Sequence, residues 1–334
     1  MNVGILSTVG RTPLVELTRV FPDAPVRLYA KLESFNPGGS SKDRPASFII
    51  REGLADGTIR PDTVVVESSS GNMGIGLAQA CSYYGLRFIC VIDPKTTAQN
   101  RQILRTYGAE LDLVSAPDPE TGEFLQSRIN RVRELQGKHR HTFWPNQYEN
   151  RHNAAAHQQT MGEIVEALDG DVDYLFCSTS TCGTLRGCAE QIRGRNLKTR
   201  VVAVDALGSV IFGGEKARRL IPGHGAAVRP ALFQHDMAER VVLVSDLDCV
   251  VGCRRLVRRE AILAGGSSGG VLTAFGRVMG ELPRGSKCVL ILPDRGERYL
   301  DTIYSDEWVE AQFGDVQHLW NPKEADECEL ELVA

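Results

Sequence analysis

The chain has 334 residues, enough for two modest domains or one large domain with a sizeable core. Its hydrophobic content of 42% and charged content of 24% are typical of a soluble globular protein. The formal net charge of -4 gives no electrostatic reason to bind nucleic acid, and no apolar run approaches the length needed to span a membrane. Nine cysteines are scattered singly without a visible secretion signal, which favours reduced thiols and a cytoplasmic location.

Apolar strands alternate with helical patterns along the chain, which predicts an α/β protein with parallel sheets covered on both faces. Two such units predict two doubly wound domains with the active site in the cleft between them. We assign residues 1–38 and 147–314 to a larger domain, 39–146 to a smaller mobile domain and 315–334 to an acidic, flexible tail. Strands are predicted at 27–33, 63–67, 87–92, 111–114, 174–177, 200–205, 241–244 and 288–292, and helices at 73–84, 97–107, 127–135, 153–168, 184–192 and 268–279.

A turn with the sequence Asn36-Pro37-Gly38-Gly39-Ser40-Ser41-Lys42-Asp43-Arg44 follows the first of these strands and precedes a helix. Proline and two glycines predict a tight turn whose backbone can approach a ligand closely. A lysine held there, partly desolvated, loses proton affinity and becomes a usable amine nucleophile. For a lone lysine, a solvated loop residue would be the simpler interpretation.

Three further turns of small residues each join a strand to a helix. Hydroxyl groups and backbone N–H groups at a helix N-terminus bind anions, although each turn alone could be an ordinary helix cap. The turns are Ser68 to Gly74, Ser178 to Thr184 and Ala264 to Gly270.

Together with the lysine turn, these motifs resemble in kind and order the β-family (fold type II) of pyridoxal-phosphate enzymes, which includes cysteine synthase and cystathionine β-synthase. The resemblance implies pyridoxal 5′-phosphate as the cofactor, bound by the larger domain, and a homodimer. It implies that Lys42 forms the Schiff base, that Asn72 contacts the cofactor's 3′-oxygen and that Ser267 faces the pyridine nitrogen. A serine there cannot hold a proton on that nitrogen, which favours loss of a β-substituent over transamination. The implied cofactor-phosphate loop consists of Ser180, Thr181, Cys182, Gly183 and Thr184, with Ser180 and Cys182 in place of two glycines.

The resemblance also implies a site for the substrate carboxylate. Gln147, in the stretch Asn146 to Asn150, would be a second contact to that carboxylate, although it could instead cap the following helix. Met73 replaces a threonine that is frequent in cysteine synthases, so a contact there would come from the backbone. The implied carboxylate loop consists of Ser69, Ser70, Gly71 and Met73.

Several stretches resemble one branch of the family, the N-(2-amino-2-carboxyethyl)-L-glutamate synthases, which supply 2,3-diaminopropionate for siderophores and some antibiotics. That branch eliminates phosphate from O-phospho-L-serine to an aminoacrylate, to which the L-glutamate amine adds, with the lysine as base at Cα. The stretches are Lys42 to Ala46, Val204 to Ala206, Gly208 to Gly213, and Leu300-Asp301 with Tyr304 to Asp306.

A phosphate leaving group needs a cationic or hydrogen-bonding clamp, for which the resemblance implies Arg128 with Tyr148 and Ser180. A solvated helix residue is a nearly equal interpretation of Arg128. The acceptor carboxylates would need basic residues, and Arg186, Arg218 and Arg219 stay open as candidates. The alternative function is a cysteine synthase that uses O-phosphoserine or O-acetylserine with sulfide. A catalytically idle relative is disfavoured, because the lysine, asparagine and serine are all present.

Overall fold

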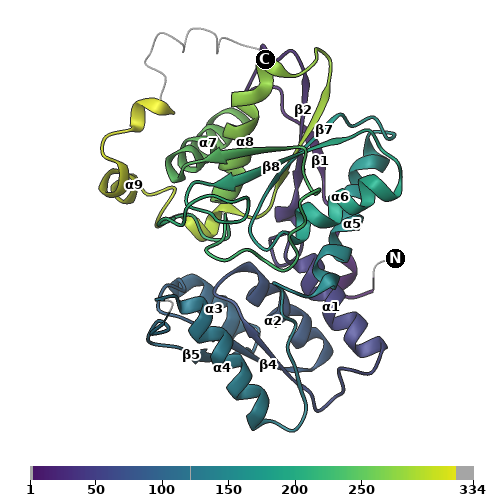
Figure 1. Ribbon diagram of the computed structural model, residues 1–334, viewed down its shortest axis with the longest axis vertical. Coiled ribbons are helices and arrows are strands. Elements are labelled where there is room, and N and C mark those ends of the chain that lie inside the picture. Colours follow the sequence, from purple (N-terminus) through teal and green to yellow (C-terminus); the bar gives the residue numbers. More distant parts are fainter. Residues whose placement is uncertain (1–2, 121, 321–334) are drawn as a thin grey trace.

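Two sheets, each covered by helices, make up the structure, a computed structural model that describes residues 3–120 and 122–320 (Figure 1). The six-stranded sheet lies in the upper half of Figure 1 and the four-stranded sheet in the lower half. The predicted tail falls largely outside the described residues, from 321 onward, and the predicted domain limits remain predictions.

The larger sheet has the strand order β1-β2-β10-β7-β8-β9. Its strand pairs are parallel except for β1, which joins the edge of β2 in an antiparallel register. All residues of β8 after Arg200 are buried, as expected for a strand covered on both faces. The strands are β1 (Leu14–Glu16), β2 (Arg27–Leu32), β7 (Tyr174–Ser178), β8 (Arg200–Ala206), β9 (Arg240–Val244) and β10 (Lys287–Leu292).

The smaller sheet has the order β5-β4-β3-β6 and is parallel throughout. Its central strands are the β-branched run of β3 and the apolar run of β4, whose buried side chains face helices on both sides. The strands are β3 (Val64–Ser68), β4 (Arg87–Ile92), β5 (Glu110–Leu113) and β6 (Thr142–Phe143).

The predicted strands and helices are all present, with ends that differ by at most three residues. The strands β1 and β6 and the helix α9 (Asp306–Phe313) had no prediction. The segment between Gly208 and Arg229 has no regular structure, as predicted. The helices are α1 (Asp43–Ala55), α2 (Asn72–Tyr84), α3 (Ala98–Thr106), α4 (Phe124–Lys138), α5 (Arg151–Ala167), α6 (Gly183–Gly194), α7 (Asp246–Glu260), α8 (Gly266–Val278) and α9 (Asp306–Phe313).

The helix α1 lies at the junction of the two sheets, because it packs against α2 of the smaller sheet and α5 of the larger one. The first residues of α1, including Asp43 and Arg44, are buried there. Lys42, directly before α1, is therefore placed where both sheets contribute residues.

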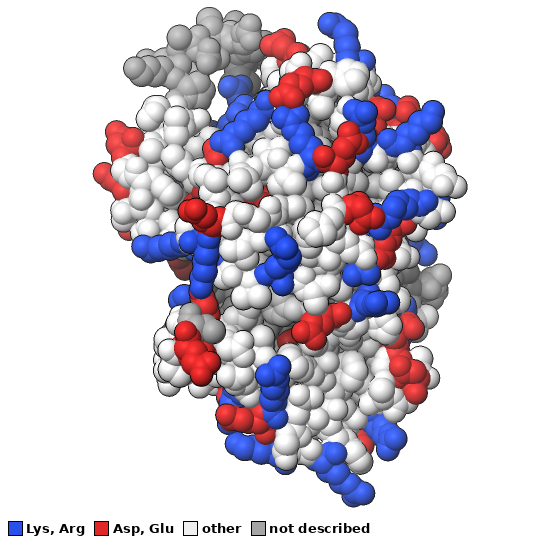
Figure 2. All heavy atoms as spheres, in the orientation of Figure 1, with Lys and Arg blue, Asp and Glu red and all other residues white. Residues whose placement is uncertain are grey.

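The surface agrees with the charge balance of the sequence. Basic and acidic side chains are interspersed over the face seen in Figure 2, without a large region of one sign. Among the helices that the structure describes, none is both long and apolar enough to cross a lipid bilayer.

Candidate active site

The lysine loop is tied to the residues that follow β10. Ser40 forms a β-bridge with Asp294, and the Ser41 amide donates to the carbonyl oxygen of Pro293 at 2.7 Å. Gly39 has a φ of +86°, a conformation that glycine adopts without strain. The loop therefore delivers Lys42 to the start of α1 from a fixed position.

The amine of Lys42 has little support from hydrogen bonds. Its Nζ lies 3.5 Å from Ser41 Oγ, a long contact. Burial lowers the pKa of Lys42, and the charge of Asp294 acts in the opposite direction. A lowered pKa leaves more of the amine neutral, which is the form that attacks a carbonyl carbon.

Asp294 connects the segments that were predicted to meet around the lysine. Its Oδ2 accepts a hydrogen bond from Asn72 Nδ2 at 2.8 Å, and its carbonyl oxygen accepts from the Gly265 amide at 3.0 Å. Gly265 directly precedes α8, whose first turn carries the buried Ser267. The structure thus brings the lysine loop, Asn72 and the start of α8 together around one carboxylate.

Some hydrogen-bonding groups of the loop after β3 already bind other residues of the protein. Ser69 Oγ accepts from the amides of Gly74 at 2.9 Å and Gly71 at 3.4 Å, and Ser70 is held through its carbonyl oxygen by Asn100 Nδ2 at 3.0 Å. The side chain of Met73 is buried in the apolar core of the smaller sheet. Only the backbone of Met73 is left to contact a ligand, as its replacement of a hydroxyl residue implied.

The loop before α6 is supported from behind by α5. Asn153 Nδ2 donates to Thr181 Oγ1 at 3.2 Å, and His157 Nε2 lies 3.2 Å from Thr184 Oγ1. A Cβ at Gly183 would stand 2.2 Å from Asn153 Oδ1, so a larger residue would force the Asn153 side chain to shift. Hydroxyl groups and the first amides of α6 are therefore held together in an arrangement that suits a phosphate.

Cys182 shows how this loop accommodates a residue other than glycine. It has a φ of +64°, in the left-handed region that glycine favours. Its side chain is buried among apolar residues of the larger sheet, and burial raises the pKa of the thiol to about 12. Cys182 therefore contributes backbone amide and packing rather than a reactive thiolate.

A chain of hydrogen bonds links the loop after β3 to the loop before α6 through Gln147. The Gln147 amide donates to Glu67 Oε2 at 3.3 Å, and its carbonyl oxygen accepts from Asn153 Nδ2 at 2.7 Å. Asn153 in turn contacts Thr181. Glu67, the last residue but one of β3, also accepts from Trp144 Nε1 at 3.0 Å, and burial raises its pKa to about 7. Gln147 is fixed between the two predicted ligand loops.

Arg128 is a buried residue of α4, so the interpretation as a solvated helix residue is wrong. Only 8% of its surface is exposed, and its Nη1 lies 3.3 Å from Asp93 Oδ2. Neither Nε nor Nη1 has a hydrogen-bond partner in the part of the chain that the structure describes. Burial raises the pKa of Tyr148 and the charge of Arg128 opposes this, because the two residues are neighbours. Unused buried donors of a guanidinium are suited to an anionic ligand.

Ser180, the third predicted phosphate contact, is less closely connected. It is half-buried in the loop before α6, on the side of the larger sheet. No hydrogen bond between described residues joins it to Arg128. Arg128 and Tyr148 are close enough to influence each other electrostatically, and Ser180 belongs to the separate loop before α6.

The match to known proteins agrees with this geometry. Residues 5–294 match the family model described as "Pyridoxal-phosphate dependent enzyme", and the chain belongs to this family. It is 47% identical over 306 residues to an N-(2-amino-2-carboxyethyl)-L-glutamate synthase of Ralstonia nicotianae, with 91% of this chain and 90% of the relative covered. A protein of the same name from Cupriavidus metallidurans is 44% identical over 309 residues, with the same coverage of both chains.

Solved structures of similar fold are cysteine synthase-like enzymes. The O-acetylserine-dependent cystathionine β-synthase of Helicobacter pylori superposes with a TM-score of 0.85 at 31% identity, covering 91% of this chain and 99% of its own. An O-acetylserine sulfhydrylase isoform from Entamoeba histolytica gives a TM-score of 0.85 at 32% identity, covering 93% and 96%. The fold is therefore that of fold type II pyridoxal-phosphate enzymes.

The residues present fit pyridoxal phosphate. The buried amine of Lys42 is matched to an aldehyde, and the hydroxyl-rich start of α6 is matched to a phosphate. The start of α8 offers the hydroxyl of Ser267 and no aspartate to a ring nitrogen. These groups therefore match the aldehyde, the phosphate and the ring nitrogen of pyridoxal phosphate in their chemistry.

Sequence reasoning missed Asp294 and Arg298 as members of this site and gave Asn153 no role. Asp294 follows the carboxyl end of the central parallel strand β10, which is where ligands bind in open α/β sheets. A buried acidic residue at that point of the pattern could have been noticed. Asn153 gave no such signal, because many asparagines stand in the first turn of a helix.

Proposed function

We propose that the protein catalyses a pyridoxal-phosphate-dependent β-replacement on O-phospho-L-serine. Phosphate leaves Cβ, and the amine of L-glutamate then bonds to that carbon to give N-(2-amino-2-carboxyethyl)-L-glutamate. This product is a precursor of 2,3-diaminopropionate for siderophores or related antibiotics. The similarity to two synthases of that name supports the acceptor, and the unpaired buried donors of Arg128 carry the assignment of a phosphorylated substrate.

The cofactor would be held by residues from three turns. Lys42 would bind it covalently, Asn72 and Ser267 would contact its ring, and the loop before α6 would bind its phosphate. That loop comprises Ser180, Thr181, Cys182, Gly183 and Thr184. When bound, pyridoxal phosphate withdraws electrons from Cα of an amino acid, which makes the Cα proton acidic and allows the β-substituent to leave.

The substrate would lie between the smaller sheet and Lys42. Its carboxylate would meet the backbone of the loop from Ser69 to Met73, together with Gln147. Lys42 Nζ would remove the Cα proton, which suits an amine whose pKa is lowered by burial.

Arg128 would stabilise the departing phosphate. Its guanidinium forms an ion pair with Asp93 through Nη1, while Nε and Nη1 make no hydrogen bond to the described residues and could donate to phosphate oxygens. Tyr148, beside it, has a pKa raised by burial and therefore stays a neutral hydrogen-bond donor. An acetate leaving group would need less positive charge than this pair provides.

The three arginines that could bind the glutamate carboxylates differ in whether other residues already pair with them. Arg186 pairs with Glu190 at 2.7 Å, and Arg219 donates to the carbonyl oxygen of His224 at 3.0 Å. Arg218 is exposed in the irregular segment between β8 and β9. We therefore favour Arg218 for the acceptor carboxylates.

We further propose that the enzyme works as a homodimer in the cytoplasm. Family resemblance is the reason for the dimer. The described cysteines are all free and buried, which suits a reducing compartment.

Product analysis tests the function directly. The holoenzyme is incubated with O-phospho-L-serine and either L-glutamate or sulfide at equal concentration, and products are identified by mass spectrometry. With L-glutamate as the acceptor, we expect N-(2-amino-2-carboxyethyl)-L-glutamate and an equal amount of released phosphate. Efficient formation of cysteine from sulfide, with no glutamate adduct, would replace the proposal with a cysteine synthase.

A further inference from the structure

The segment after β10 carries two charged residues that the proposed reaction does not use. Asp294 and Arg298 both bind the side-chain amide of Asn72, the first residue of α2. Asn72 Nδ2 donates to Asp294 Oδ2 at 2.8 Å, and Asn72 Oδ1 accepts from Arg298 Nη1. A carboxylate accepts only and a guanidinium donates only, so these two partners permit one orientation of the amide. We call Asp294 and Arg298 the Asn72 clamp.

The clamp is itself held in place by neighbouring elements. Tyr299 Oη donates to Asp294 Oδ2 at 2.5 Å, and the Gly265 amide donates to the Asp294 carbonyl oxygen at 3.0 Å. Arg298 Nη2 donates to the carbonyl oxygen of Gly38 in the lysine loop. Asp294 is 3% exposed, so water does not compete for these bonds. The clamp joins α2, the lysine loop and the start of α8.

The side-chain amide of Asn72 has a second N–H group, and its surroundings can be described from the residues beside it. An amide nitrogen has two N–H groups, and Asp294 accepts one of them. The Asp294 carboxylate is also a close electrostatic neighbour of Lys42. In pyridoxal phosphate the phenolic oxygen is on the ring carbon next to the one that carries the aldehyde to which a lysine binds. A donor beside Lys42 is therefore placed to meet that oxygen.

We propose that Asp294 and Arg298 are positioning residues that hold the Asn72 amide with its free N–H toward the phenolic oxygen of the cofactor. Without the clamp the amide can rotate and present its carbonyl oxygen, which repels a negatively charged oxygen. The inference depends on the cofactor family and on Lys42 as its ligand. It does not depend on the identity of the substrates, so either conclusion can fail without the other.

Cofactor affinity in a double-mutant cycle tests the clamp. Binding of pyridoxal phosphate to cofactor-free protein is followed by its visible absorbance for Asp294→Asn and Arg298→Lys, each in the native chain and in an Asn72→Ala background. We expect about tenfold weaker binding for each in the native chain, as for loss of one charge-assisted hydrogen bond. With Asn72→Ala present, the same substitutions should change affinity by less than about twofold, because they act through that residue.

Matched controls separate positioning from general damage. Arg284→Lys, in the exposed turn before β10, and Asp301→Asn, in the exposed part of the segment after it, make the same chemical changes and should leave cofactor affinity unchanged. Thermal unfolding of the cofactor-free variants reports folding, and the nearly isosteric Asp294→Asn carries the test if Arg298→Lys does not fold. Equal weakening with and without Asn72, or no weakening in the native chain, would overturn the proposal.

Discussion

Glu163 gives a stability prediction that depends on pH. It belongs to a buried cluster with Lys31, Glu33 and Arg44, behind the lysine loop. Arg44 Nη1 lies 2.7 Å from Glu163 Oε1, Arg44 Nε lies 2.7 Å from Glu33 Oε2, and Lys31 Nζ lies 2.7 Å from Glu163 Oε2. The side chains of Arg44 and Lys31 are only 1% and 2% exposed. The cluster ties the first turn of α1 to β2 and α5.

The pKa of Glu163 sets the expected magnitude. Burial acts to raise it, but the hydrogen bonds and charges of Arg44 and Lys31 outweigh burial and lower it from 4.5 to about 2. At about 1.4 kcal/mol per pH unit, this interval corresponds to about 3 kcal/mol of stability at neutral pH. Breaking a buried ion pair costs a similar amount, about 3–5 kcal/mol. Since the folded-state pKa is the lower one, the contribution is complete above pH 4.5 and lost as pH falls toward 2.

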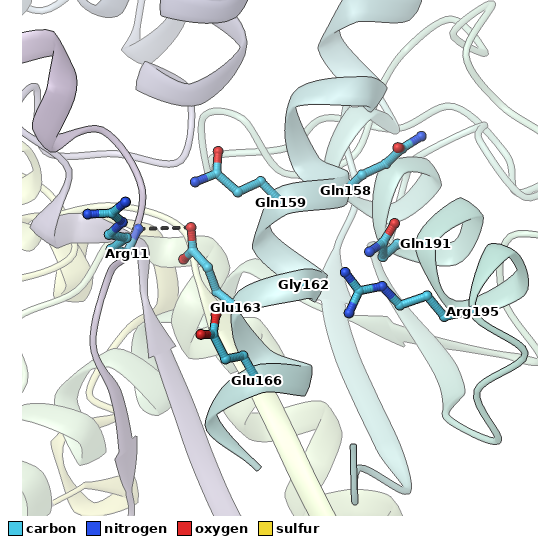
Figure 3. Close-up of a pocket in the computed structure, with 8 residues that line it drawn as sticks. All are labelled: Arg11, Gln158, Gln159, Gly162, Glu163, Glu166, Gln191 and Arg195. Carbon is cyan, nitrogen blue, oxygen red and sulfur yellow. Dashed lines mark hydrogen bonds between the residues drawn. The ribbon is translucent and has the colours of Figure 1, made fainter. Parts of the chain in front are cut away.

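Urea unfolding of Glu163→Gln measures this contribution. We expect a loss of about 3 kcal/mol relative to the native chain at pH 7, shrinking to about 2 kcal/mol near pH 3.5. Glu166→Gln is the matched control, because Glu166 lies one turn further along α5, is exposed, and lines the same cavity of about 600 Å³ (Figure 3). Figure 3 also shows the Arg11 amide donating to Glu163, at 2.8 Å. A loss below about 1 kcal/mol, or one that does not depend on pH, would refute the reasoning.

Three further predictions concern the site. Arg128→Ala should lower kcat/KM for O-phosphoserine about 100-fold but much less for O-acetylserine. The control Arg131→Ala, on the same helix, should change neither value. An equal loss for both substrates would contradict a phosphate contact. Ser267→Asp should slow phosphate release and alter the visible spectrum of the bound cofactor, because a carboxylate holds a proton on the ring nitrogen; unchanged spectra and rates would remove Ser267 from that position. Cys182→Val should lower the free energy of unfolding by about 2 kcal/mol, and Cys182→Gly by less, since only glycine is unstrained at a φ of +64°; urea unfolding that ranks the two equally would contradict this.

The sequence was informative where local pattern determines structure. Strands such as β3 and β4 are continuous apolar runs followed by small-residue turns, and parallel strands place such turns at one edge of a sheet. Lys42 and Asn72 follow strands of different sheets, so this rule does not bring them together, and it was the family resemblance that implied their shared site. The structure places them in one cluster through Asp294.

The sequence was uninformative where a side chain's role depends on distant partners. Arg128 stands on a helix of mixed polarity, and its burial follows from packing of α4 over β3 and β4, with Asp93 as a partner. Glu163 and Arg44 are 119 positions apart, so their ion pair has no local signature. Asn153 and Gly183 fit together only because α5 and α6 pack closely. Such pairs are set by tertiary packing rather than by hydrophobic period.

The placement of these contacts assigns different parts of the reaction to different sheets. Lys42 precedes a helix of the smaller sheet, yet its loop is bonded to Pro293 and Asp294, and Arg44 is paired with Glu33 and Glu163. The predicted smaller domain, residues 39–146, includes Lys42, but these contacts tie the lysine loop to the larger sheet. Arg128, on α4, and the loop after β3 belong to the smaller sheet. The Asn72 clamp joins the two parts, because Asp294 and Arg298 follow β10 of the larger sheet and Asn72 begins α2 of the smaller one.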